Sequence, residues 1–314
     1  MHNLFLLEIT EFKWELLLYF TPLLFTLGSI TLASILGFIW EKKRKRVDIL
    51  IGAKGFGATD DSLRLFYGWV PFILGFHVAV ALMVNGIRGN LFTSEFPLTG
   101  FTANWVGLTE IMIALSFFYG GITRPAAVLL GILWWLTIVL YGVLPTLENI
   151  QFLGYACFFF LAGRGPYSID RLLFPNLEPK PSYTSSALYF LRVCVGLNLI
   201  VFAFFRKYGD TTLAADLISP QSAVNYPILF ASAVELLAGI LIVFGIFPRI
   251  TMLATIIFIN TLFMASHWNA FVDYFPMLGA LAILLVWEPD NLKQKLLWVE
   301  EIRKKVPKSE QEIF

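Results

Sequence analysis

The chain has 314 residues, of which 58% are hydrophobic and only 14% are charged, and its mean hydropathy is +0.74. These values lie outside the range of soluble domains and indicate an integral membrane protein. The net charge of +1 excludes the basic surface that nucleic-acid binding requires. The N-terminal stretch has no basic region or small-residue cleavage pattern, so we expect no cleaved signal peptide.

Nine apolar stretches follow one another along the chain. A helix needs about 20 largely apolar residues to cross a bilayer, and no period-two alternation competes with these runs. The predicted fold is therefore an all-α integral membrane protein with nine transmembrane helices. The predicted spans cover residues 15–40, 65–86, 104–121, 126–145, 150–163, 185–205, 226–246, 250–266 and 271–287.

Basic residues orient the predicted bundle, because Lys and Arg accumulate in short cytoplasmic loops. The run "EKKRKR" (41–46) follows the first span directly. With this loop in the cytoplasm, 19 of the 23 basic residues fall on the same side. We therefore predict an N-terminus outside and a C-terminus in the cytoplasm.

An internal repeat appears when the chain is shifted by 125 residues. The matched positions are Glu110 and Glu235, Gly120 and Gly245, Arg124 and Arg249, Glu148 and Asp273, and the "LG" pairs at 153–154 and 278–279. Each unit holds four spans, an even number, so the two units are predicted to be parallel repeats.

The repeat divides the chain into five segments. They are an N-terminal transmembrane helix with a basic cytoplasmic loop (1–63), a first four-helix unit (64–173), a linker rich in Pro and Ser (174–186), a second four-helix unit (187–297) and a cytoplasmic tail (298–314).

The second unit carries several short motifs. They are a glycine and a lysine near the end of its first helix (Gly196 and Lys207), "VELLAGILIVFGIFPR" (234–249), an outer "HWN" (267–269) and a final "EPDN" (288–291), while the first unit has "GRGPYSID" (163–170) after its fourth helix. This arrangement resembles the DoxX/DoxD family of four-helix membrane proteins, here in two copies. The first unit matches less well, because Ala79 and Gly142 stand where the second has the lysine and the outer histidine.

The resemblance implies a bacterial inner (plasma) membrane and an association with thiosulfate:quinone oxidoreduction or membrane oxidoreductase complexes. It leaves about the first 60 residues unexplained.

Glu110 and Glu235 are carboxylates within predicted spans, where an unpaired charge costs several kcal/mol. One interpretation is a proton-exchanging group tuned by burial. The other is a structural side chain that bonds across the unit, which its presence in both copies favours.

The second unit gathers polar residues in its outer half: Arg206, Lys207, Glu235, His267 and Asp273. A quinone headgroup needs donors at its carbonyls and a group that exchanges protons. We expect Lys207 and His267 to hold the headgroup and Glu235 to exchange the proton. Alternatively, His267 only hydrogen-bonds at the membrane interface and Lys207 only extends toward water.

Three further polar residues lie in or near the predicted spans. Arg64 and Arg192, near the inner ends of the first helices of each unit, fit an anionic headgroup or a cross-helix acid. His77 lies mid-span and is interpreted as a hydrogen-bonded core histidine. With only three histidines and two cysteines in the chain, we expect no haem, Fe–S cluster or zinc.

The leading hypothesis is a redox-associated subunit that interacts with non-covalently bound quinone and a membrane or peripheral redox partner. A small-solute or proton transporter and a non-enzymatic membrane scaffold or assembly factor are the alternatives. The substrate, the electron donor and the oligomeric state are open.

Overall fold

A computed structural model describes residues 20–43, 60–165, 167–174, 181–206, 226–265 and 268–287. In these ranges every regular element is a helix, apart from one isolated bridge between Asn90 and Pro97. The prediction of an all-helical protein is therefore confirmed for the described residues.

A helix lies over each of the nine predicted spans. They are α1 (Phe20–Lys43), α3 (Asp60–Arg88), α4 (Gly100–Tyr119), α5 (Thr123–Tyr141), α7 (Ile150–Ala162), α9 (Pro181–Val201), α11 (Tyr226–Phe244), α12 (Pro248–Ala265) and α13 (Trp268–Val286). Three short elements complete the set: α6 (Val143–Leu147), α8 (Ile169–Leu173) and the π-helix η2 (Phe202–Arg206).

Among the described residues, five helices are long and apolar enough to cross a membrane: α1, α3, α4, α5 and α9. Shorter apolar helices lie in α7, α11 and α13. Because a bilayer core is about 30 Å thick, five helices of this length indicate a helical membrane protein.

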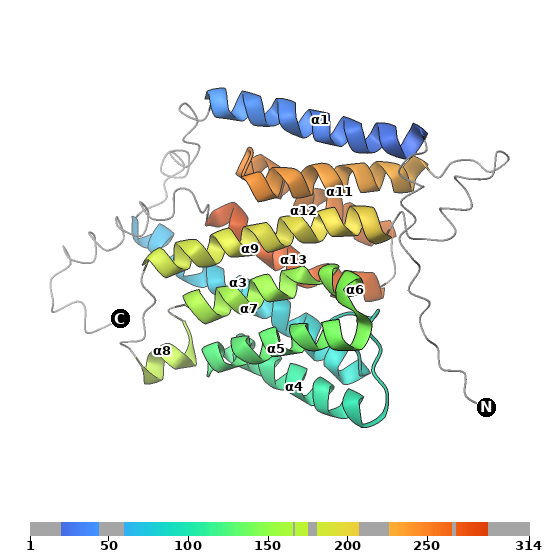
Figure 1. Ribbon diagram of the computed structural model, residues 1–314. Coiled ribbons are helices and arrows are strands. Elements are labelled where there is room, and N and C mark those ends of the chain that lie inside the picture. Colours follow the sequence, from blue (N-terminus) through green and yellow to red (C-terminus); the bar gives the residue numbers. More distant parts are fainter. Residues whose placement is uncertain are drawn as a thin grey trace, which may run out of the picture.

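The helices pack in a reciprocal pattern. Helix α3 packs on α4 and α9 packs on α11, while α5 packs on α7 and α12 packs on α13. Across the two predicted units, α7 packs on α9 and α13 packs on α3. The fourth helix of each predicted unit thus lies against the first helix of the other, which places α3, α7, α9 and α13 between α4 and α5 on one side and α1 and α11 on the other (Figure 1).

Glycines make these two cross-unit contacts close. A Cβ on Gly154 of α7 would lie 2.8 Å from Cβ of Cys194 on α9. A Cβ on Gly279 of α13 would lie 2.6 Å from Cβ of His77 on α3. Both glycines belong to the matched "LG" pairs, so the same small residue brings each fourth helix against its neighbour.

The turns after α4 and α11 share one backbone geometry. Gly120 and Gly245 have φ of 70° and 66°, and Ile122 and Phe247, two residues later, have φ of 49° and 44°. Glycine adopts positive φ at no steric cost, whereas Ile and Phe rarely do so. The same uncommon turn therefore occurs twice, 125 residues apart.

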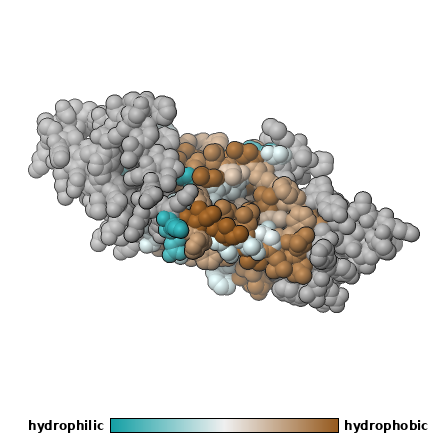
Figure 2. Space-filling view, turned by 90° about the horizontal axis from the view of Figure 1, so that it is seen from above, coloured by the Kyte–Doolittle hydropathy of each residue, from teal (hydrophilic) through white to brown (hydrophobic). Residues whose placement is uncertain are grey.

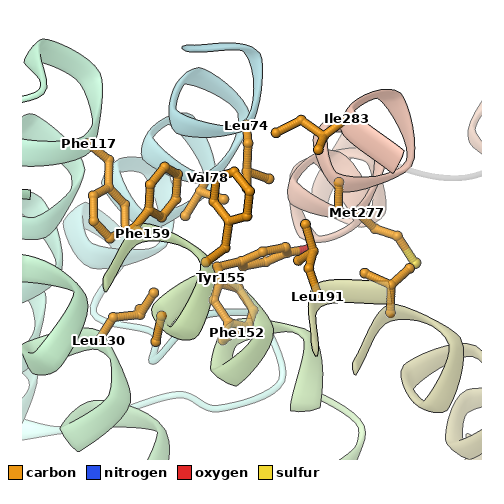
Figure 3. Close-up of a cluster of buried hydrophobic side chains, with 14 of the residues drawn as sticks. Leu74, Val78, Phe117, Leu130, Phe152, Tyr155, Phe159, Leu191, Met277 and Ile283 are labelled. Atoms are coloured by element: carbon orange, nitrogen blue, oxygen red, sulfur yellow. The ribbon is translucent and has the colours of Figure 1, made fainter. Parts of the chain in front are cut away.

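A continuous apolar core joins both predicted units (Figure 3). Tyr155 of α7 is fully buried near its centre, and its hydroxyl donates to Oε1 of Gln151 at 3.0 Å. Around it Figure 3 places Leu74 and Val78 of α3, Leu191 of α9 and Met277 of α13. The centre of the core thus lies among α3, α7, α9 and α13, and residues such as Phe117 of α4 and Leu130 of α5 extend it.

One boundary differs from the sequence expectation. Helix α9 begins at Pro181, inside the segment 174–186 predicted as a linker. Proline is favoured in the first turn of a helix, because its fixed φ suits the helix and its missing N–H is not needed there. The Pro- and Ser-rich composition therefore also marks a helix start.

Candidate functional site

The structure describes the side chains of five of the nine predicted site residues: Glu110, Glu235, Asp273, Arg192 and His77. Arg64 lies within α3 and Arg206 within η2, with side chains outside the described part. Lys207 and His267 lie outside the described residues. The predicted outer cluster can therefore be followed through Glu235 and Asp273.

Glu110 holds the loop between α3 and α4. Its side chain is fully buried, and Oε1 accepts a hydrogen bond from the backbone N–H of Phe92 at 2.7 Å. Phe92 has φ of 67°, an uncommon conformation for a bulky residue, and its ring stacks on Phe152 at 4.4 Å. The carboxyl group thus stabilises a strained loop residue that reaches into the core.

Asp273 of α13 holds the same loop from the other predicted unit. It accepts hydrogen bonds from the backbone N–H of Ser94 at 3.2 Å and from the Ser94 hydroxyl at 2.6 Å. The amide of Asn85 bridges Asp273, at 3.3 Å, and the carbonyl of Phe92, at 2.7 Å. The outer cluster predicted for the second unit thus shares one carboxylate, that of Asp273, with the α3–α4 loop.

Glu235 is 3% exposed and lies on the face of α11 that packs on α9 and η2. Ser232 and Gly239, three residues before and four after it, share this face. The Ser232 hydroxyl donates to the carbonyl of Ala203 in η2 at 2.8 Å, and a Cβ on Gly239 would lie 2.7 Å from the carbonyl oxygen of Gly196. Glu235 therefore lies at the level where α9 becomes π-helical.

His77 lies at the contact between α3 and α13. Its Nδ1 is 2.7 Å from the carbonyl oxygen of Ile73, and its ring stacks on Phe275 at 4.3 Å. Both interactions are those of a histidine packed inside a helix bundle.

Arg192 belongs to α9 and is 4% exposed. Its guanidinium lies against the C-terminal end of α11. Its guanidinium carbon is 5.0 Å from the centre of the Tyr189 ring, and a Cβ on Gly245 would lie 2.7 Å from its Nη1. A positive charge at this position complements the negative end of a helix dipole.

Arg164, which follows α7, lies at the C-terminal end of α4 much as Arg192 lies at that of α11. Its Nε donates to the carbonyl of Phe117 at 2.8 Å and its Nη2 to that of Phe118 at 2.9 Å, at the end of α4. The guanidinium also lies 4.2 Å from the centre of the Phe72 ring. Burial lowers the pKa of Arg164 to about 10, so the side chain remains charged at neutral pH.

Asp170 also binds the α4–α5 turn. Its carboxylate accepts hydrogen bonds from the backbone N–H of Ile122 and, at 2.8 Å, of Thr123, at the start of α5. Arg164 and Asp170, both in "GRGPYSID", therefore hold the α4–α5 turn from its two sides. The sequence analysis did not predict this role, because the turn lies more than 40 residues before Arg164 and Asp170 in the chain. The one available signal was the pair of charged residues within the motif "GRGPYSID".

In the part of the chain that the structure describes, no three His, Cys, Asp or Glu side chains are grouped closely enough to hold a metal ion.

No family model, no curated protein and no solved structure matches the chain.

Proposed function

We propose that the chain is a redox-associated membrane subunit that binds quinone in its second half and exchanges protons through Glu235. The sequence motifs that resemble the DoxX/DoxD family support the redox and quinone part. The placement of Glu235 beside η2 supports the choice of the second half, and it is the observation that carries the proposal.

The π-helix distinguishes the two halves. Helix α3 is α-helical from Asp60 to Arg88, whereas α9 changes to π-helix over its last turn. π-Helical turns occur mostly as isolated insertions and frequently at functional sites, because they shift the side chains that follow. Here the π-helix ends at Arg206, next to Lys207 of the predicted site. The hydroxyl of Ser232, on the same face of α11 as Glu235, donates to the carbonyl of Ala203 within this π-helix.

The two buried glutamates then have different tasks. Glu110 serves the fold, because its carboxyl group accepts from Phe92 of the outer loop. Its copy Glu235 transfers protons to and from a quinone oxygen, as a buried carboxyl group at a functional site can do. Reduction of the quinone takes two electrons and two protons. The electrons come from a redox partner protein or a reduced substrate, and Lys207 and His267 bind the headgroup.

Mass spectrometry of organic extracts from the purified protein tests this proposal. The wild type should retain quinone in stoichiometric amounts, and Glu235→Gln should lose it. Glu110→Gln is the matched control, because it makes the same change in the other copy and should retain quinone. Quinone at the level of the surrounding lipid in the wild type would refute the proposal.

We also propose that the nine helices cross the membrane as one N-terminal helix and two parallel four-helix units, with the N-terminus outside. The repeated turn geometry and the reciprocal packing of α7 on α9 and α13 on α3 support the duplication. Labelling of single cysteines introduced into the loops, from each side of the membrane, tests the orientation. An α4–α5 turn that is labelled only from outside would contradict it.

A further inference from the structure

A groove of about 350 Å³ runs along the edge of the bundle between α1 and α12. Its floor is α11, through Leu237 and Leu241. Its sides are Leu36 of α1 and Ile250 and Ala254 of α12. None of these residues belongs to the proposed quinone site.

The packing of α1 explains why the groove stays open. Small residues of α1 lie against α11 and the turn after it: Ser29 donates to the carbonyl of Ala233 at 3.0 Å, Ala33 is buried, and a Cβ on Gly37 would lie 3.2 Å from Cδ1 of Ile246. Small residues let α1 and α11 approach each other closely. At these positions α1 has no long side chain that could reach across to α12 and fill the space between the two helices. α1 is thus fixed on one side of α11, with α12 on the other.

The groove accepts hydrocarbon. The two threonines in its wall use their hydroxyls internally, since Thr251 donates to the carbonyl of Ile246 at 2.9 Å and Thr255 donates to that of Thr251 at 2.7 Å. The remaining lining is aliphatic or aromatic. A ligand would therefore gain burial of apolar surface and find no polar group to bind.

The groove is short as well as apolar. Its floor extends from Val234 to Leu241, about 10 Å at 1.5 Å per residue. The hydrocarbon of one bilayer leaflet is about 15 Å thick, half of a core of about 30 Å, so the groove covers much of the length of one acyl chain.

One end of the groove lies beside basic residues. Phe247, which lines the groove, packs on Trp40 with ring centres 4.8 Å apart, so the end of α1 lies beside the α11–α12 turn. Lys42 and Arg249 each follow this aromatic pair by two residues, and α1 ends at Lys43 within the run "EKKRKR". Aromatic and basic residues of this kind gather at the cytoplasmic interface and attract anionic lipid headgroups.

We propose that this groove binds an acyl chain of an anionic phospholipid, with the phosphate at the end that carries Lys42 and Arg249. The face that carries α1 is largely hydrophobic, with hydrophilic residues toward one end (Figure 2). A lipid with one acyl chain in the groove and a negative headgroup beyond it matches both features. The bound lipid would fix α1 to the rest of the bundle, which α1 otherwise contacts mainly through α11.

Lipid analysis of the full chain, purified in polymer-bounded native discs, tests this inference. Bound phospholipid is counted by native mass spectrometry after transfer to detergent. Ala254→Phe fills the groove from α12 and should lose the retained phospholipid. Leu129→Phe is the matched control, since Leu129 is the lipid-exposed residue 125 positions earlier, on α5, and it should retain the lipid. Ala254→Leu, a smaller change, should give a partial loss.

The headgroup is tested separately. In vesicles that mix phosphatidylglycerol and phosphatidylcholine, the wild type should retain phosphatidylglycerol preferentially, and Lys42→Gln should lose that preference. Equal retention of both lipids, or the same loss in Leu129→Phe as in Ala254→Phe, would overturn the proposal. A quinone in the same spectra that is lost in Ala254→Phe, with no bound phospholipid, would overturn it in favour of a prenyl tail. The inference does not depend on the proposed quinone site.

Discussion

Asp273 and Ser94 join parts of the chain that lie 179 residues apart. The Asp273 carboxylate accepts from both the backbone N–H and the hydroxyl of Ser94, and α13 is thereby tied to the loop between α3 and α4. The same loop is held by Glu110 of α4 through Phe92. Two carboxylates, one from each predicted unit, thus fix one loop.

The Asp273–Ser94 contact should appear as a coupling free energy. Residues that share hydrogen bonds show interaction energies of roughly 0.5–3 kcal/mol in double-mutant cycles. We expect Ser94→Ala and Asp273→Asn to be less destabilising together than the sum of the two single changes. The free energy of unfolding is measured by titration with a denaturing detergent.

An unrelated serine provides the control for this cycle. Ser34 is exposed on α1 and donates only to the carbonyl of Ile30 on its own helix, at 2.8 Å. Ser34→Ala should be additive with Asp273→Asn. Additivity in the Ser94 cycle as well would contradict the contact.

Glu110 should be important for the fold in a way that glutamine can reproduce. In Glu110→Gln the side-chain oxygen can still accept from Phe92. In Glu110→Ala the buried N–H loses its acceptor, which costs about 1–3 kcal/mol, and the cavity adds to this. We expect a large fall in melting temperature only for the alanine variant, with faster proteolysis in the loop 89–99. Equal melting temperatures for the two variants would argue against the hydrogen bond.

The positions of the helices could be predicted from the sequence because each apolar run approaches the length that a bilayer imposes. The two similar turns could also be anticipated, because Gly120 and Gly245 recur 125 residues apart at the ends of two apolar runs. The partner of each helix was not predictable. A pattern of apolar residues shows that a face is buried but not which helix covers it, so the packing of α7 on α9 emerged only from the structure.

The candidate site shows the same limit. Burial of Glu110 and Glu235 followed from their places within apolar runs, and both are buried. Their bonding partners depend on tertiary structure. Phe92 adopts a positive φ that aromatic residues rarely show, so no local signal indicated that its N–H would face Glu110.

The glycines at the cross-unit contacts should tolerate no side chain. In Gly279→Ala the added Cβ would meet Cβ of His77 at 2.6 Å, and overpacking of this kind costs about 1–3 kcal/mol. Gly28→Ala is the control, because nothing lies within 4 Å of that position on α1, and alanine there should be neutral or slightly stabilising. Melting temperatures in one detergent compare the two. A stable Gly279→Ala protein would show that α3 and α13 are not in close contact.

Arg164 should stabilise the bundle through its hydrogen bonds and not through its charge alone. Arg164→Met removes both bonds to the end of α4, at roughly 1.5–3 kcal/mol for each bond to a charged group. Arg164→Lys keeps the charge but cannot donate from two nitrogens of a planar fork. We expect the lysine variant to unfold at an intermediate detergent concentration. If lysine restored full stability, the two-donor geometry would be unimportant.

Glu148, between α6 and α7, should make stability depend on pH. Burial raises the pKa of its carboxyl group from 4.5 to about 7 in the folded protein. Between these two values the folded state binds more protons than the unfolded state, so the free energy of unfolding should fall as the pH rises from about 4.5 to about 7. Above that window the contribution is constant.

Glu148→Gln has no proton to lose, so the difference in stability between the variant and the wild type should grow across this pH range and then level off. Unfolding is followed by circular dichroism in buffers of matched ionic strength. A difference that is independent of pH would mean that Glu148 titrates as it does in the unfolded chain, and that the α6–α7 junction is open to water.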